Sequence, residues 1–384
     1  MTPVAIGIIG CGNISDSYFK GAAGSKIVSV AACADLKPEL AVEKAEIYGA
    51  KAMSVDELLA DKAVSIVINL TVPLAHAEVS RQILAAGKHV YTEKPLAARL
   101  ADANQVLELA EAKGLMVGSA PDTFMGAAHQ AARRAIDDGR IGQVVAGAAA
   151  VISRGMEHWH PNPEFFFKPG GGPILDVGPY YVTQLVNLLG PVARVTAVAT
   201  RGLPKRTVTS EPLAGSLIDV EVATSVNGVL EFVSGANVTL TASWDVWKHT
   251  RLPFELYGTE GSLLVPDPNF FGGDVEISDE DGDWQALDIS AFPFGVPNKP
   301  TSKGAMVADY RMIGLLDMAA AIQAGRPHRA SGALALHALE VMEGLQTASD
   351  TGRHVAIETR PDRPAPVPLG AGEEVFLQAD SKAA

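Results

Sequence analysis

The chain has 384 residues, of which 47% are hydrophobic and 20% charged, a balance typical of globular proteins with ample material for a core. Its 31 basic and 44 acidic residues give a net charge of -13, which argues against a nucleic-acid backbone or an anionic membrane surface as the main partner. Two cysteines cannot build a disulfide framework, and no apolar stretch has the roughly 18 residues of a membrane span. We therefore expect a cytoplasmic protein, and its length suits two domains.

Short apolar runs alternate with helical patterns over residues 1–122. The runs lack a helical period, which predicts strands buried on both faces. They cover Val4–Gly10, Ile27–Ala34, Ser65–Leu70, His89–Thr92 and Leu115–Gly118. Helices are expected at Leu40–Tyr48, Val55–Ala60, Leu74–Ala86 and Leu100–Lys113. Strands that alternate with crossover helices predict an α/β domain of the Rossmann type, with a doubly wound parallel sheet.

Strands dominate after a helix at Ala127–Asp138, so residues 123–355 are expected to form an α+β domain with a large, mostly antiparallel open sheet. The predicted strands are Val144–Ile152, Val192–Thr200, Ile218–Val226, Val229–Val233, Val238–Trp247, Phe254–Tyr257, Ser262–Val265 and Val275–Ser278. Turn signals at Asn227-Gly228, Gly235-Ala236-Asn237 and Glu260-Gly261 predict hairpins. Helices are expected at Ala305–Ala324 and Gly332–Ser349, and residues 356–384 are expected to be an extended, partly proline-rich tail.

A glycine turn at residues 10–15 follows the first predicted strand and should open the first helix. Gly10 permits a tight turn, and Gly12 lets the backbone approach a pyrophosphate closely. The N–H groups that would bind this anion at the helix start belong to Asn13 and Ile14. Ser15 stands where the dinucleotide fingerprint has its third glycine, so the motif is incomplete and also has a purely structural interpretation.

Asp35 strengthens the prediction of a dinucleotide site. It ends the second strand, 23 residues after Gly12, where a carboxylate can accept hydrogen bonds from the adenosine ribose. Its charge would repel the 2′-phosphate of NADP, so NAD is the expected cofactor, although Lys37 nearby keeps NADP open. Asp35 can equally cap the helix that follows.

Four further segments resemble the Gfo/Idh/MocA oxidoreductases, the family of glucose–fructose oxidoreductase and inositol dehydrogenase. They are Asn69–His76, which looks like the family's loop after the fourth strand, Glu93-Lys94-Pro95, the glycine-rich stretch Gly170–Tyr180, and Tyr257–Leu263. The resemblance spans residues 1 to about 355. It implies that Thr71 and His76 touch the ribose and phosphates of the cofactor and that Glu93 and Lys94 lie near the nicotinamide riboside. Without the family, His76 is a helix-start histidine, and Glu93 and Lys94 are an exposed ion pair.

Oxidation of an alcohol by nicotinamide needs a group that removes the hydroxyl proton. A tyrosine side chain is a poor base at its ordinary pKa of about 10, and a neighbouring ammonium favours the phenolate. Lys94 and Tyr180 can therefore work as a pair, while Asp176, four residues earlier, would share a helix face with Tyr180. The resemblance implies that Asp176 binds substrate and that Tyr180 is the acid/base. Many members carry histidine in place of Tyr180, and those members are the better guide to inositols as substrates.

An aromatic loop at residues 158–167 precedes the glycine-rich stretch. Trp159 and His160 suit the apolar faces and hydroxyl edges of a sugar, or they fill a proline-pinned loop. A third ligand with convincing spacing is missing, so no metal is expected. Asp122 and Thr123, after the last Rossmann strand, either face substrate or serve as a hinge or helix cap.

The sequence thus predicts an NAD(P)-dependent dehydrogenase that acts on a secondary alcohol of a sugar, sugar derivative or cyclitol. Alternatives are an NAD-dependent glycosidase that uses transient oxidation and a non-catalytic cofactor or sugar sensor. The family resemblance also implies a homodimer or homotetramer that pairs through the open sheet.

Overall fold

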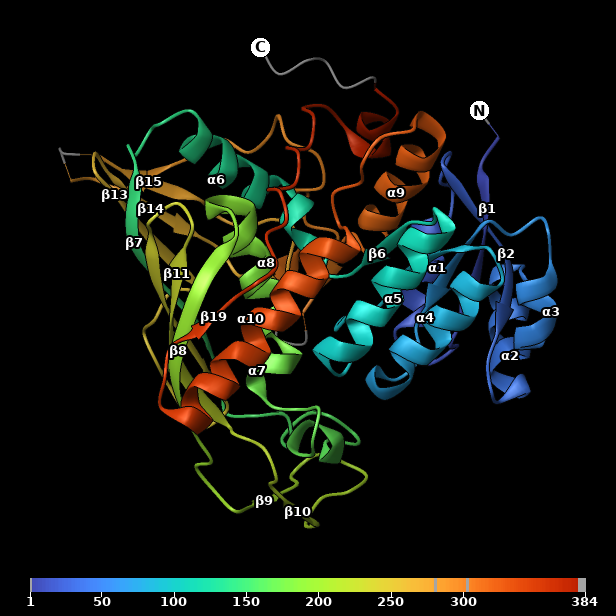
Figure 1. The fold of residues 1–384 in the computed structure, drawn as a ribbon, viewed down its shortest axis with the longest axis horizontal. Coiled ribbons are helices and arrows are strands. Elements are labelled where there is room, and N and C mark those ends of the chain that lie inside the picture. Colours follow the sequence, from blue (N-terminus) through green and yellow to red (C-terminus); the bar gives the residue numbers. More distant parts are fainter. Residues whose placement is uncertain (1, 280–281, 302–303, 379–384) are drawn as a thin grey trace. The chain divides into compact units, whose positions relative to one another are not determined.

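The computed structural model describes residues 2–279, 282–301 and 304–378 (Figure 1). The chain divides into two compact units, each built from separate stretches of sequence. The first unit holds Met1–Ala127, Ser290–Leu336 and Pro364–Ala384, and the second holds Ala128–Ile289 and His337–Arg363. The sequence predicts one division after residue 122 and a separate tail, whereas in the structure two later segments belong to the first unit.

A six-stranded parallel sheet with strand order β3-β2-β1-β4-β5-β6 forms the centre of the first unit. Its strands are β1 (Val4–Ile9), β2 (Val28–Ala34), β3 (Lys51–Ala52), β4 (Ile66–Asn69), β5 (His89–Thr92) and β6 (Val117–Ser119). The helices between them are α1 (Ser15–Ala22), α2 (Pro38–Tyr48), α3 (Val55–Ala60), α4 (His76–Ala85) and α5 (Leu100–Lys113). The strand order reverses between β1 and β4, and ligands bind at such a switch point, outside the carboxyl ends of the strands. The predicted doubly wound sheet is confirmed.

The helix expected at Ala305–Ala324 is wrong at its start. Met306–Val307 forms strand β18, which pairs with β17 (Lys299–Pro300), and the helix α9 begins only at Ile313 and ends at Ala324. Met312 before it has a positive φ of 90°, which breaks the helical path. Pairing with the neighbouring strand β17 therefore replaces the expected first turns of the helix.

A nine-stranded sheet with strand order β16-β15-β14-β13-β7-β12-β11-β8-β19 dominates the second unit. Only the β7–β12 pair is parallel among its described pairings, so the expected mostly antiparallel sheet is confirmed. Its strands are β7 (Val144–Ile152), β8 (Val192–Thr200), β11 (Ser225–Phe232), β12 (Asn237–Ser243), β13 (Phe254–Gly258), β14 (Ser262–Val265), β15 (Glu276–Ser278), β16 (Gln285–Ala286) and β19 (Val355–Ala356). The helices are α6 (Ala127–Asp137), α7 (Pro173–Asp176), α8 (Gly178–Leu189) and α10 (Gly332–Thr351), and α8 and α10 lie along one face of the sheet (Figure 1).

The turn predicted at Asn227-Gly228 is wrong, because both residues lie inside β11. A Cβ atom on Gly228 would stand 2.5 Å from a methyl carbon of Leu345 on α10. The glycine therefore serves close helix–sheet packing rather than a reversal. The hairpin predicted at residues 235–237 is confirmed, since the N–H of Phe232 donates to the carbonyl of Ala236 at 2.8 Å.

A small antiparallel sheet, β9 (Lys205–Thr207) with β10 (Leu217–Asp219), extends from the second unit over its own apolar cluster. This cluster contains Phe166, Phe167, Val208, Ile218, Val220 and Trp244. Arg206 lies beneath it, nearly inaccessible, with ion pairs to Glu157 and Asp245. The partnered guanidinium ties the strand to the loop that carries the aromatic residues 158–167.

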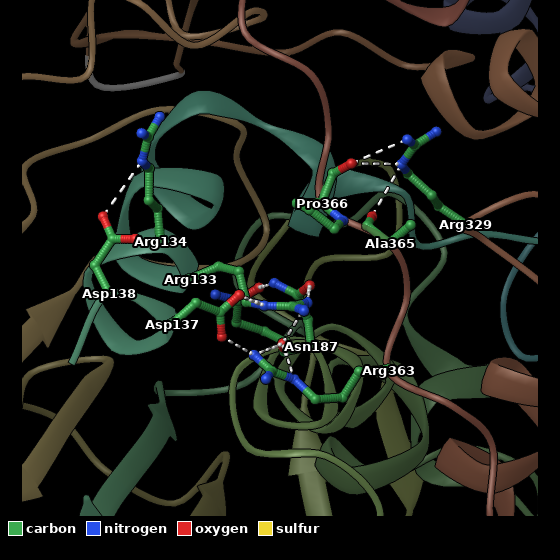
Figure 2. Close-up of polar contacts among 10 residues, drawn as sticks. Arg133, Arg134, Asp137, Asp138, Asn187, Arg329, Arg363, Ala365 and Pro366 are labelled. Atoms are coloured by element: carbon green, nitrogen blue, oxygen red, sulfur yellow. Dashed lines mark hydrogen bonds and ion pairs between the residues drawn. The ribbon is translucent and has the colours of Figure 1, made fainter. Parts of the chain in front are cut away.

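Two arginines, Arg363 and Arg329, hold successive parts of the segment after β19 (Figure 2). In the second unit, Arg363 donates to Asp137 at 2.9 Å and to the carbonyl of Asn187 at 3.1 Å. In the first unit, Arg329 donates to the carbonyls of Ala365 and Pro366. Residues 360–371 carry no helix or strand, as predicted, and a 3-10 turn follows at Gly372–Leu377.

Candidate functional site

The glycine turn lies at the carboxyl end of β1, beside the chain that leaves β4. Gly10 has a φ of 102°, and a Cβ atom there would stand 2.6 Å from the carbonyl carbon of Leu70. Only glycine therefore fits the turn at this position. Gly12 has no atom within 4 Å of where its Cβ would be, so the backbone is open to a ligand.

The start of α1 offers unpaired donors. Among the described residues, no group accepts from the N–H of Gly12, Asn13 or Ile14. Ser15, in place of the third glycine, is buried and donates its hydroxyl to the carbonyl of Gly12 at 2.6 Å. The departure from the fingerprint thus stabilises the turn, and the donor set matches the chemistry of a pyrophosphate.

Asp35 is bound to this turn. Its Oδ2 accepts from the N–H of Cys11 at 2.7 Å, and its Oδ1 accepts from the N–H of Lys37 at 2.9 Å. The carboxylate therefore has a fixed orientation between the turn and the chain that enters α2, although the N-cap of α2 is Lys37 and no side chain of the described residues caps this helix. A carboxylate offers about four lone-pair positions, which leaves acceptor capacity for ribose hydroxyls.

The loop after β4 is organised by Asn69, a buried residue to which the sequence assigned no role. Its Oδ1 accepts from the Thr71 hydroxyl at 2.7 Å, and its Nδ2 donates to the carbonyl of His76 at 2.9 Å. His76 is buried as well, with its ring nitrogens 3.0 Å from the Thr71 carbonyl and 2.7 Å from the Pro95 carbonyl. Burial lowers the pKa of His76, and its contacts hold two loops together.

Glu93 and Lys94 follow β5 at the same sheet edge. Glu93 is 8% exposed; its Oε1 accepts from the Tyr18 hydroxyl at 2.7 Å, and its Oε2 accepts from the N–H of Lys94 at 3.0 Å. Lys94 itself is half-buried. Tyr18 is a residue that sequence reasoning missed, because nothing in the helical pattern of α1 distinguishes it from an ordinary core tyrosine.

Asp122 and Thr123 lie after β6, and both side chains are buried. Asp122 accepts from the N–H of Gly314 at 2.8 Å, and burial raises the pKa of its carboxyl to about 6. Thr123 starts a 3-10 turn that ends at Met125. Asp122 thus binds a backbone N–H in the first turn of α9, which supports the helix-cap alternative for this residue.

Asp176 and Tyr180 belong to the second unit, whereas Lys94 belongs to the first. Asp176 ends α7 and is half-buried, and Tyr180 lies in the first turn of α8, 5% exposed. Val177 separates the two helices, so the single helix predicted to carry both residues is interrupted. Tyr181 points into the core, where its ring packs on Phe254 at 4.9 Å.

The aromatic loop leaves Trp159 58% exposed, while His160 is half-buried. The His160 ring makes edge contacts with Trp159 and Phe166, and its Nδ1 accepts from the N–H of Asn162 at 3.1 Å. The hydroxyl of Ser210 donates to the His160 carbonyl at 2.6 Å, which anchors the loop. Trp159 thus stands on a supported loop with free ring surface.

Two family models match the chain. A model described as an oxidoreductase family with an NAD-binding Rossmann fold covers residues 4–120, and the GFO/IDH/MocA C-terminal domain covers residues 129–264. The chain belongs to the GFO/IDH/MocA oxidoreductase family. The resemblance stated from the motifs is confirmed, and so is the NAD-binding character of the first domain.

This GFO/IDH/MocA oxidoreductase has curated relatives that act on sugars. It is 31% identical over 268 residues to 1,5-anhydro-D-fructose reductase of Ensifer adhaerens, which covers 67% of this chain and 74% of the relative. It is also 31% identical over 264 residues to dTDP-3,4-didehydro-2,6-dideoxy-alpha-D-glucose 3-reductase of Streptomyces violaceoruber, with 68% and 72% covered. The crystal structure of an NAD binding oxidoreductase from Klebsiella pneumoniae shares the fold, with a TM-score of 0.79 and 24% identity over 93% of this chain and 100% of that one.

Within residues 2–279, 282–301 and 304–378, no helix has the length and apolar character to cross a membrane. In the same ranges, His, Cys, Asp and Glu side chains do not gather in groups of three that would suit a metal ion.

Proposed function

We propose that this family member transfers a hydride between nicotinamide and a secondary alcohol or ketone of a sugar, sugar derivative or cyclitol. One observation carries the proposal: the open glycine turn, Asp35 and Lys94 follow β1, β2 and β5 at one edge of the Rossmann sheet. Ligands of open α/β sheets bind at this edge. NAD, when bound there, supplies the hydride acceptor or donor.

In this proposal the N–H groups of Gly12, Asn13 and Ile14 bind the pyrophosphate, with Gly10 shaping the turn. Asp35 accepts hydrogen bonds from the adenosine ribose while it keeps those from the turn. Its charge disfavours a 2′-phosphate, which makes NAD the preferred cofactor over NADP.

Thr71 and Lys94 are proposed to contact the cofactor from the neighbouring loops. Contact by His76 and Glu93 stays a prediction. Both side chains are buried and expose little surface to a ligand. This favours a role in which they hold Thr71 and Lys94 in place over direct contact with the cofactor.

We assign the transfer of the hydroxyl proton to residues of the chain itself. Tyr180, as phenolate, takes the proton of the substrate hydroxyl while the hydride leaves the carbon that carries this hydroxyl. In the reverse direction Tyr180 returns a proton to the carbonyl oxygen. The Lys94 ammonium stabilises the phenolate, and Asp176 orients the substrate hydroxyl. This assignment requires the two units to bring Lys94 and Tyr180 together when substrate is bound.

Trp159 and His160 are proposed to bind the sugar, because an exposed indole offers an apolar face to the C–H groups of a ring. Contact by Asp122 and Thr123 stays a prediction. The sugar substrates named for the two curated relatives support this substrate class. The first unit is thus the cofactor domain, and the second is the substrate domain.

We also propose a homodimer or homotetramer that forms through the open face of the nine-stranded sheet. Val198 and Val229 are exposed there, at 67% and 37%. Light scattering coupled to size-exclusion chromatography tests this. A monomer at micromolar concentration would rule it out.

A substrate screen tests the activity. Purified protein is mixed with NAD or NADP and with myo-inositol, D-glucose, D-xylose, levoglucosan or an aryl glucoside, and absorbance at the NADH band is followed. Stoichiometric NADH with NAD supports the dehydrogenase. Release of the aryl alcohol without net NADH identifies a glycosidase, and cofactor binding without turnover of any panel member identifies a sensor.

A further inference from the structure

A buried hydrogen bond joins the helix of the glycine turn to the segment that carries Lys94. Tyr18 lies on α1, one turn after Ser15, and is 1% exposed. Its hydroxyl donates to Oε1 of Glu93 at 2.7 Å. Burial and the nearby Glu93 charge raise the pKa of Tyr18 well above its ordinary value, so the hydroxyl keeps the proton that it donates.

The same Glu93 carboxylate also binds the backbone of Lys94. Its Oε2 accepts from the N–H of Lys94 at 3.0 Å, and in the described part of the chain no third group hydrogen-bonds the carboxylate. The other nearby phenol, Tyr91, has a buried hydroxyl without a partner among the described residues, so it does not replace Tyr18. Each carboxylate oxygen thus has one assigned donor.

The next residue is held from the other side. The Pro95 carbonyl lies 2.7 Å from Nδ1 of His76, at the start of α4. Lys94 therefore stands between two anchored peptide groups, one bound through Glu93 and one bound through His76. A backbone fixed on both sides sets the direction in which the Lys94 side chain leaves the chain, and so the positions that its ammonium can reach.

We propose that Tyr18 is a positioning residue that acts through Glu93 to hold Lys94 for hydride transfer. The link begins in the helix whose start would bind the pyrophosphate, so it also connects the dinucleotide turn to Lys94. The inference rests on the proposed role of Lys94. It extends that role to a residue that reaches neither cofactor nor substrate in the proposed site.

Hydrogen exchange tests the tether itself. Because Pro95 has no amide hydrogen, fragments that end at residues 93 and 95 differ only by the Lys94 amide. Tyr18→Phe should speed exchange of this amide about tenfold or more, because an unsupported carboxylate holds its donor less firmly. Tyr48→Phe is the matched control, since its hydroxyl also bonds a carboxylate on α1, that of Asp16, at 2.9 Å. Equal exchange in both variants would overturn the proposal.

Turnover tests the functional part, with the panel sugar or polyol that the wild-type protein oxidises. Tyr18→Phe should lower kcat about tenfold with the KM for NAD within about twofold, as expected for loss of positioning rather than of cofactor contact. In a Glu93→Ala background, Tyr18→Phe should have no further effect on kcat. A raised KM with unchanged kcat, or additive losses in the double variant, would contradict action through Glu93. If no panel member reacts, the exchange experiment still decides the tether, and the failure belongs to the proposed activity.

Discussion

The N–H of Cys11 donates a 2.7 Å hydrogen bond to Oδ2 of Asp35, so the glycine turn and the acid at the end of β2 form one structural element. An acid in this place is expected to bind ribose, and here it also fixes the turn. Removal of its charge therefore acts on two parts of a dinucleotide at once. Substitutions of Asp35 that keep or remove its acceptor oxygens can therefore separate ribose binding from the fixing of the turn.

Asp35→Ser should weaken NAD binding by about tenfold or more and improve NADP relative to NAD, because the repulsion of a 2′-phosphate disappears. Asp35→Asn keeps one oxygen for an N–H donor and should lose less affinity for NAD. Calorimetric titration with both cofactors measures this. Glu39→Ser, which removes an exposed acid from the first turn of α2, should leave both affinities unchanged. Equal affinities of the wild-type protein for NAD and NADP would contradict the cofactor assignment.

Tyr180→Phe should lower kcat by about 100-fold or more while NAD binding stays near normal, a size typical for loss of acid/base help. Tyr181→Phe is the adjacent control. Its ring packs on Phe254 within the second unit, and burial together with the nearby Asp267 charge raises the pKa of Tyr181, so loss of its hydroxyl should affect stability but leave kcat nearly unchanged. Comparable kcat losses in the two variants would show that Tyr180 acts through packing.

Lys94→Ala should also lower kcat by about 100-fold or more, because the phenolate loses the ammonium that stabilises it. Steady-state KM values for NAD and for the oxidised sugar provide the check, because loss of acid/base help lowers kcat and leaves both KM values nearly unchanged. A raised KM for the sugar with an unchanged kcat would assign Lys94 to substrate binding.

Asp122→Asn should change stability in a pH-dependent way. Burial raises the pKa of Asp122 to about 6 from its ordinary 3.8, so the folded state binds an extra proton between these values. The wild-type protein therefore loses stability as pH rises from about 4 through 6, and the variant escapes that loss. The variant should gain about 1–3 kcal/mol relative to wild type between pH 4 and pH 7 in urea unfolding. Asp56→Asn, at an exposed acid, should show no such trend.

His337 should contribute in the opposite direction. Burial lowers its pKa to about 4 from 6.5, and its Nε2 accepts from the N–H of Val192 at 3.0 Å. The unfolded chain binds the proton more readily, so stability is lost as pH falls from about 6.5 through 4. His337→Gln, whose amide offers both an acceptor and a donor, should reduce that loss by about 1–3 kcal/mol. The exposed His354→Gln serves as control, and an identical loss in both variants would refute the assignment.

The fold was predictable where the local pattern agrees with the final packing. β1 and β4 are continuous apolar runs, and they form the buried centre of the parallel sheet. The errors have two causes. Gly228 lies against Leu345 of α10, a residue distant in the chain, and residues 306–307 pair with the nearby residues 299–300, a strand pair that no local pattern marks.

The candidate site was predictable at positions that carry a motif, such as the glycine turn, Asp35 and Glu93-Lys94. Its supporting residues were not, because Asn69 and Tyr18 act through contacts with residues that are distant in the chain or offset by a loop. A buried tyrosine with a carboxylate partner has the same sequence pattern as one packed among leucines. Only the distance to Glu93 distinguishes them.

The discontinuous make-up of the first unit has a consequence for the order in which it can form during translation. The N–H of Ser119 donates to the carbonyl of Ala330 at 3.0 Å, and Asp122 bonds the N–H of Gly314 at 2.8 Å. Both partners leave the ribosome long after the six strands of the parallel sheet have been made. The nascent cofactor domain must therefore wait with the outer edge of its last strand open, and with a buried acid without its donor, until residues 314–331 have been synthesised.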